Sequence, residues 1–279
     1  MHVTKWAWGC VKIIAIDYAG GMNVKTKLPL PALRVLGWLA FAALLAATAL
    51  TLWLPTGEIP SDSSRFSYSL FTPAPFTRYI WIMICAGQLL FLLHQSGLWR
   101  RGAHDALTER VCLLPALANA LGGAGLLLWA CRRPLTALAV LAAALLTLAA
   151  VHRRVGEPED RRDRWLTQVP FRLYLGWASV TAMACAAAVL AQGGFPVLGL
   201  PEDIWAALLV AFAAVLGVAM LLRHRDFPFA AAMAWALLGI FIRHTMALDG
   251  IYSSVALTSL LGLMAVAGGI AYAFLQGKR

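Results

Sequence analysis

The sequence predicts an all-α polytopic membrane protein with about eight transmembrane helices, and three observations support this prediction. Of the 279 residues, 61% are apolar and only 13% are charged, whereas about a quarter of the residues in a soluble domain are charged. The apolar residues fall into eight runs, each near the roughly 20 residues that a helix needs to cross a bilayer. Lysine and arginine gather in the short connections between these runs, which is typical of membrane proteins.

The eight runs are expected to become eight spans. The third and fourth are separated only by the break at Arg132-Arg133-Pro134, so we expect a close helical hairpin in which the fourth span is the short one. The expected spans are residues 32–54, 76–98, 111–131, 134–151, 169–191, 203–222, 227–245 and 252–275.

The distribution of positive charge predicts the orientation in the membrane. With the N-terminus inside, the inside segments carry 17 Lys and Arg residues and the outside segments carry five. Because positive residues stay on the cytoplasmic side, we expect a multi-pass inner (cytoplasmic) membrane protein with both termini cytoplasmic. The net charge of +10 then reflects insertion and contact with anionic headgroups of the lipid bilayer, and we expect no nucleic-acid partner.

A basic tail, residues 1–31, precedes the first span. Its apolar run at residues 11–19 is too short and too interrupted to span, and it lacks a signal-peptide cleavage site. Met22 opens a more ordinary N-terminus, so residues 1–21 are expected to be an extension of the gene model.

A proline-rich stretch, LFTPAP at residues 70–75, leads into the second span; we call it the lip. Pro73 and Pro75 fix two φ angles and disfavour helix in the residues before them, so the lip is expected to be stiff and non-helical. The polar loop 55–76 suits a lid over a cavity. Trp81, one turn inside the second span, is interpreted either as an interfacial anchor or as the wall of a pocket under the lip.

A second group of candidates stands at the head of the fifth span. Tyr174 and Trp177 are three residues apart and share a helix face, and Gly176 allows close approach of a helix or a flat ligand. Arg172 precedes them, and we expect Arg172 or Arg78 to pair with a carboxylate of a ligand. The alternative is an aromatic belt at the interface, with Arg172 snorkelling to headgroups.

Two other polar sites lie in apolar surroundings. Asn119 is costly in the third span unless it is bonded, so it is expected to bond a neighbouring helix or to reach a ligand. Arg243 and His244 end the seventh span, where snorkelling to the interface is the simpler interpretation and a proton or anion relay is the alternative.

Motifs of enzyme chemistry are missing from the sequence. It contains no HExxH, Walker or GxSxG motif, no paired intramembrane carboxylates, and five cysteines without metal-ligand spacing. We therefore expect no catalytic residues, no metal site and no enzymatic activity.

Three stretches resemble the TspO/MBR family (translocator protein, or tryptophan-rich sensory protein) in its longer bacterial form with extra helices. LFTPAPFTRYIWIMICAGQLLFLLHQ is similar to the first loop and second helix of that family, and PFRLYLGWASVTAMAC is similar to its fifth helix. WAALLVAFAAVLGVAMLLRHRDFPFAAAMAWALLGIFIRH is similar to the tail of the longer members. The resemblance covers roughly residues 30–275.

The resemblance implies a TspO-like five-helix unit over residues 32–192 and three additional transmembrane helices over residues 193–279. In that family the five helices enclose a pocket for porphyrins, haem-like tetrapyrroles, sterols and hydrophobic drugs, covered by the first loop. Three family positions differ here, because Gly122, Cys85 and Cys185 stand where a tryptophan, a tyrosine and an asparagine are expected. The carried-over ligand-binding positions are Pro73, Pro75, Trp81, Asn119, Tyr174 and Trp177.

These features lead to the hypothesis of a membrane binding or sensor protein for a planar hydrophobic ligand, tetrapyrrole- or sterol-like. No cofactor is expected to be required, although a porphyrin or haem-like molecule is a candidate ligand. A small-molecule transporter and a membrane scaffold without a ligand are the alternatives, and a homodimer is left open.

Overall fold

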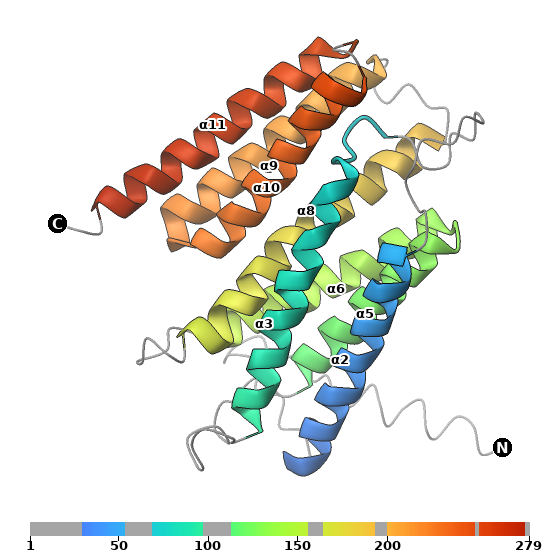
Figure 1. Ribbon diagram of the computed structural model, residues 1–279, viewed down its shortest axis with the longest axis vertical. Helices are drawn as coiled ribbons and strands as arrows, with labels where there is room; N and C mark the ends of the chain where they lie inside the picture. The colour runs from blue at the N-terminus through green and yellow to red at the C-terminus, as the bar shows by residue number, and fades with distance from the viewer. Residues whose placement is uncertain are drawn as a thin grey trace, which may run out of the picture.

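The computed structural model describes residues 30–53, 69–96, 113–155, 164–192, 200–248 and 251–276. Over these residues the chain forms eight long α-helices and no strand, so the prediction of an all-α polytopic membrane protein is confirmed (Figure 1). The helices are α2 (Leu30–Trp53), α3 (Ile80–Gln95), α5 (Leu114–Ala130), α6 (Pro134–Val155), α8 (Val169–Gln192), α9 (Glu202–His224), α10 (Phe227–Ile242) and α11 (Ser253–Gln276).

Every predicted span corresponds to one of these helices, but the short span is the third and not the fourth. Helix α5 has 17 residues, while α6 has 22 and is one of seven segments in the described chain long and apolar enough to cross a membrane. Helix α6 continues past its apolar run because Arg153 and Arg154 are good helix formers and favour the negative end of the helix dipole.

Two tight turns connect neighbouring helices. The expected hairpin between α5 and α6 is closed by Arg132, whose φ of 57° is left-handed, and Arg133 N–H donates to the Leu128 carbonyl at 3.0 Å. Arg225 has a φ of 47° and ends α9 in the same way, and Asp226 then begins α10 as its N-cap. Both pairs are therefore antiparallel neighbours.

Five helices pack in a closed ring. Around the ring the order is α2, α5, α6, α8 and α3, and α3 returns to pack against α2. Helices α9, α10 and α11 pack on one another beside this ring, and α10 joins them to it by lying along α8 (Figure 1). The division into residues 32–192 and 193–279 remains a prediction, although this arrangement fits it.

Three short helical segments extend the long helices. A 3-10 helix, η1 (Pro75–Tyr79), leads into α3; a π-helix, η2 (Arg164–Gln168), leads into α8; and a second π-helix, η4 (Arg243–Ala247), follows α10. The predictions for most of the basic tail, for much of the loop 55–76 and for the centre of the loop 152–168 lie outside the described residues.

Candidate functional site

The lip is non-helical, as predicted from its two prolines. Ala74 has φ −59° and ψ 150°, an extended conformation, and Pro75 is the first residue of η1. Pro75 suits this position because the first N–H of a helix has no partner within the helix. The lip therefore leads into α3 next to α10 and η4 (Figure 1); we call this end of the molecule the lip end.

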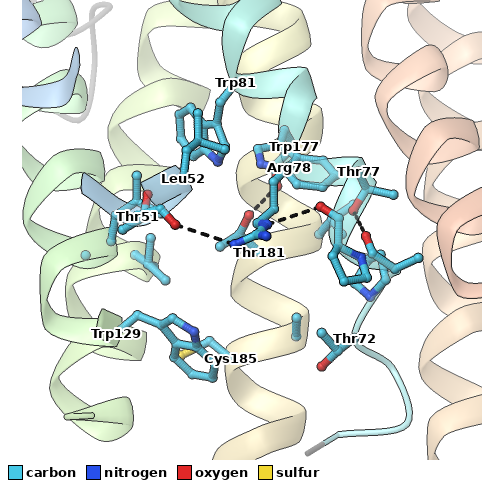
Figure 2. A pocket seen from close by; sticks show the side chains of 18 of the residues that line it. Thr51, Leu52, Thr72, Thr77, Arg78, Trp81, Trp129, Trp177, Thr181 and Cys185 are labelled. Atoms are coloured by element: carbon cyan, nitrogen blue, oxygen red, sulfur yellow. Dashed lines mark hydrogen bonds between the residues drawn. The ribbon is translucent and has the colours of Figure 1, made fainter. Parts of the chain in front are cut away.

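A cavity of about 430 Å³ lies beside the lip, whose residues line one side of it (Figure 2). Residues of all five ring helices line it, together with the lip, η1 and two residues of η4. Its size falls within the roughly 300–1,000 Å³ that is usual for small-molecule sites. The ring thus encloses a hollow at the lip end, where the loop was expected to cover one.

Indole rings from three helices line this cavity. Trp81 of α3 and Trp177 of α8 are only 7% and 6% exposed, so they contact the interior and not the lipid. Trp129 of α5 joins them from another side of the cavity (Figure 2). Of the two interpretations of Trp81, the structure therefore supports the wall of a pocket.

Tyr174 supports the cavity from below instead of lining it. Its ring packs edge-on against Trp81, with centroids 5.6 Å apart, and its hydroxyl donates to the Ala118 carbonyl at 3.4 Å. That hydroxyl occupies the space that a Cβ on Gly122 would need. Tyr174 consequently fills the space at position 122, where the resemblance places a tryptophan and this chain has glycine.

Polar groups are few and lie near the lip. Arg78 donates from Nε to the Pro75 carbonyl at 3.1 Å and from a terminal nitrogen to the Thr51 carbonyl at 3.5 Å. Arg243 also lines the cavity, and no acidic residue lies among its lining residues in the described chain. The site is an apolar, indole-lined chamber with guanidinium groups at one end.

Comparison with protein families agrees with this architecture. A family model described as TSPO-like protein matches residues 34–272, which is most of the chain. The chain belongs to the TSPO-like protein family. Neither the comparison with curated proteins nor that with solved structures gives a match.

In this TSPO-like protein, Asn119 bonds a neighbouring helix, which is one of its two expected roles. Its Nδ2 donates to Gln88 Oε1 of α3 at 3.4 Å, and both side chains are buried. The pair satisfies part of the hydrogen-bonding capacity of two amides inside the ring. Asn119 is not among the residues that line the cavity.

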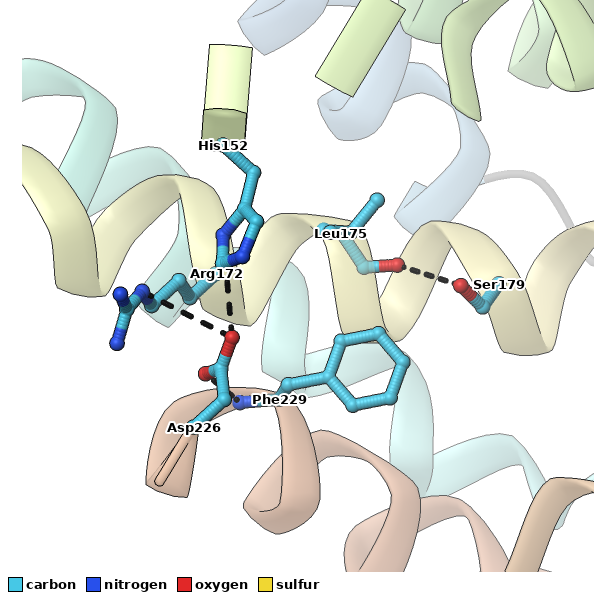
Figure 3. A network of polar contacts seen from close by, with 6 residues as sticks. All are labelled: His152, Arg172, Leu175, Ser179, Asp226 and Phe229. Atoms are coloured by element: carbon cyan, nitrogen blue, oxygen red, sulfur yellow. Dashed lines mark hydrogen bonds and ion pairs between the residues drawn. The ribbon is translucent and has the colours of Figure 1, made fainter. Parts of the chain in front are cut away.

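Arg172 lies away from the cavity, at the opposite end of the ring from the lip. Its Nε is 3.7 Å from Oδ2 of Asp226, and His152 Nδ1 is 3.9 Å from the same oxygen (Figure 3). Asp226 is fully buried, and its Oδ1 accepts the backbone N–H of Phe229 at 3.1 Å. Arg172 therefore contributes to a charged contact between α8 and the start of α10.

Burial raises the pKa of Asp226 above its ordinary value of 3.8. The charge of Arg172, the N–H of Phe229 and the charge of His152 act in the opposite direction without cancelling the desolvation. The folded protein therefore holds the Asp226 proton to a higher pH than the unfolded chain does. The stability that this group contributes is greatest below its ordinary pKa and is lost as pH rises through the raised pKa.

This sign gives a prediction for Asp226→Asn, which mimics the protonated carboxyl and keeps an oxygen for the Phe229 N–H. Between about pH 4 and pH 7, the unfolding temperature of wild type should fall relative to that of Asp226→Asn. Asp226→Ala also removes the N-cap and should have an unfolding free energy about 1 kcal/mol lower than that of Asp226→Asn at every pH in this range. Thermal unfolding of the purified wild type and of the two variants over a pH series measures both differences. A difference between wild type and Asp226→Asn that is constant with pH would contradict the raised pKa.

Sequence reasoning did not single out one residue of the cavity and two residues that make contacts between helices. Trp129 ends an apolar run like many lipid-facing tryptophans, and only the ring geometry shows that it faces the cavity. Trp235 lies within an apolar run of α10 and packs its ring against Phe76 of η1, with centroids 5.5 Å apart. Asp226 had a usable signal, because an Asp three residues before Phe229, with Pro228 between them, is a common helix start.

Proposed function

We propose that this TSPO-like protein binds a planar hydrophobic ligand, tetrapyrrole- or sterol-like, in the cavity beside the lip. The supporting observation is the convergence of Trp81, Trp129 and Trp177 on one hollow within the five-helix ring. Indole faces supply stacking and dispersion to a flat apolar molecule. Three rings from three helices provide such faces around a single ligand.

An unsatisfied donor supports a ligand with an acceptor group. Nε1 of Trp177 is buried and has no hydrogen-bond partner among the described residues. A buried N–H without an acceptor costs about 1–3 kcal/mol, which a ligand oxygen would recover if the Trp177 ring turned its N–H toward the cavity. Arg78, at the rim, supplies a positive charge that suits a ligand carboxylate.

The direct test is a titration with protoporphyrin IX. We expect wild type to bind it, and the double variant Trp81→Phe, Trp177→Phe to bind it roughly 5- to 150-fold more weakly. This range assumes that each aromatic contact contributes about 0.5–1.5 kcal/mol. Quenching of tryptophan fluorescence and the shift of the porphyrin absorption band should be followed together, because the band shift does not depend on the tryptophans removed.

A matched control removes two other indoles. Trp165 is exposed and Trp205 is on α9, and neither lines the cavity. Trp165→Phe combined with Trp205→Phe should leave the dissociation constant unchanged. Equal affinity of the cavity variant and this control would overturn the proposed pocket.

We further propose that the protein acts as a binding or sensor protein of the bacterial inner membrane, with both termini cytoplasmic and no catalytic step. The excess of Lys and Arg on the inside segments supports this orientation. It places the lip and the cavity mouth on the outer side of the membrane, and the Arg172–Asp226 contact on the cytoplasmic side. Cysteine labelling of a single exposed residue at each end, with a membrane-impermeant maleimide on intact cells, tests the orientation.

A further inference from the structure

The lip itself is hydrogen-bonded to the C-terminal helices, which pack beside the ring. Helix α10 and η4 supply hydrogen bonds to the lip and to the residues on either side of it. The Gly239 carbonyl accepts the Ala74 N–H at 3.1 Å, and Trp235 Nε1 donates to the Thr77 carbonyl at 3.0 Å. The other donors are Arg243, to the carbonyls of Thr72 at 2.7 Å and Ser69 at 3.4 Å, and His244, to the carbonyl of Leu70 at 2.7 Å.

Helix α10 is shaped for this contact at Gly239. A Cβ at this position would collide with Thr77 Cγ2 and lie 3.2 Å from Pro73 Cβ. Any larger residue would therefore push the lip away from α10. The missing side chain lets the helix backbone reach the lip backbone directly.

The lip needs such external donors because of its composition. Pro73 and Pro75 have no N–H, so the lip cannot form a regular ladder of its own hydrogen bonds. Its carbonyls would remain unpaired at the edge of an apolar bundle, which is costly. Arg243 donates to the Thr72 carbonyl, and His244 donates to the Leu70 carbonyl. Their expected role of snorkelling to the interface is therefore replaced by a role inside the protein.

His244 is the more informative of the two residues. It is fully buried and does not line the cavity, so it would not contact a bound ligand itself. Because a carbonyl can only accept, the proton that bonds the Leu70 oxygen belongs to Nε2 of His244. Arg243 both holds the lip and lines the cavity, so its substitution would mix two effects.

We propose that the three C-terminal helices are a working part of the ligand site, with His244 and Arg243 as positioning residues that hold the lip in place along one side of the cavity. The rates at which a ligand enters and leaves are then set by how firmly α10 holds the lip. This inference rests on the proposed function only where it concerns a ligand. The position of the lip itself can be measured without one.

The first experiment measures hydrogen exchange of residues 69–79 in the ligand-free full-length protein. His244→Leu keeps the side-chain volume but removes the donor, and it should raise the exchange rate of the Ala74 amide at least about tenfold. His244→Gln keeps a donor at a similar reach and should restore most of the protection. The control is Ser254→Ala, which breaks the 3.0 Å bond to Asp203 within the same three helices and should leave residues 69–79 unchanged.

The second experiment measures protoporphyrin IX kinetics on the same variants. His244→Leu should raise both the association and the dissociation rate about tenfold or more and change the dissociation constant much less, because the lip gates access. His244→Gln should fall between His244→Leu and wild type. A residue with a merely structural role would not raise the two rates together.

The outcomes separate the two proposals. If wild type does not bind protoporphyrin IX, the proposed ligand is wrong, and hydrogen exchange still tests the hold on the lip. Unchanged exchange of residues 69–79 in His244→Leu would overturn the inference. So would equal exchange in His244→Leu and Ser254→Ala, because the effect would then be a general loosening of the C-terminal helices. If His244→Leu does not fold, Gly239→Ala takes its place, because its new Cβ would collide with Thr77 and push the lip away from α10. Greater exchange of residues 69–79 in Gly239→Ala than in Ser254→Ala supports the inference, and equal exchange overturns it.

Discussion

Gly122→Ala is expected to destabilise this TSPO-like protein by about 1–3 kcal/mol, the usual cost of overpacking a filled interior. The new Cβ would collide with the Tyr174 hydroxyl, and it would lie 3.7 Å from a methyl group of Leu44 on its other side. Tyr174 is itself fixed between Trp81 and the Ala118 carbonyl, so it has little room to move. The unfolding temperature of the purified protein measures the loss.

Two variants distinguish this clash from a general effect of losing a glycine. Gly268→Ala adds a Cβ where no atom lies within 4 Å, and it should leave stability equal or slightly raised, since alanine favours helix. Tyr174→Phe removes the clashing oxygen, so the double variant Gly122→Ala, Tyr174→Phe should recover a large part of the loss relative to Tyr174→Phe alone. An unfolding temperature of Gly122→Ala equal to that of Gly268→Ala would show that Tyr174 does not fill this space.

Gly176→Leu should be at least as damaging, because it separates the ring from the C-terminal helices. A Cβ at Gly176 of α8 would lie 2.8 Å from Ala232 Cβ and 2.9 Å from the Phe229 carbonyl oxygen of α10. Backbone atoms cannot rotate away as a side chain can, so α8 and α10 would have to move apart. We expect a loss of roughly 3 kcal/mol or more and weaker protoporphyrin IX binding, although Gly176 does not line the cavity.

The control for this variant is Gly268→Leu, which introduces the same side chain on an exposed position of α11. It should keep both stability and binding near wild type. If Gly176→Leu matched this control in both measurements, the close packing of α8 on α10 would be refuted. The contact also settles the two expectations for Gly176, since the close neighbour in this structure is a helix.

The hydropathy pattern was sufficient to predict the helices of the fold, because a membrane span needs a minimum apolar length that can be read directly from the sequence. Each of the eight runs became a helix. Two of the aromatic candidates could also be found from the sequence. Trp81 and Trp177 stand at helix positions that lipid alone would not require, and both line the cavity. The ends of the helices were harder to predict from the sequence, since α6 continues through basic residues beyond its apolar run.

Contacts between distant segments could not be read from the chain. Arg172 looked like a ligand or headgroup partner, because nothing in the sequence says that Asp226 lies 3.7 Å away. His244 looked interfacial for the same reason, since its partner Leu70 is 174 residues earlier. Polar residues at the ends of apolar runs are ambiguous whenever a partner helix, and not water, satisfies them.

The distance along the chain between the lip and its donors also has a consequence for synthesis. Arg243 is 171 residues downstream of Thr72. The ribosome therefore completes the first five spans long before it makes the hydrogen-bond donors of α10 and η4 that hold the lip. During that interval the ring helices that line the cavity are present, but the lip is not yet held in place by α10 and η4. A fragment that ends after α8 therefore lacks the hydrogen bonds that fix the lip. We expect the proposed ligand to be retained only once the seventh span has been inserted.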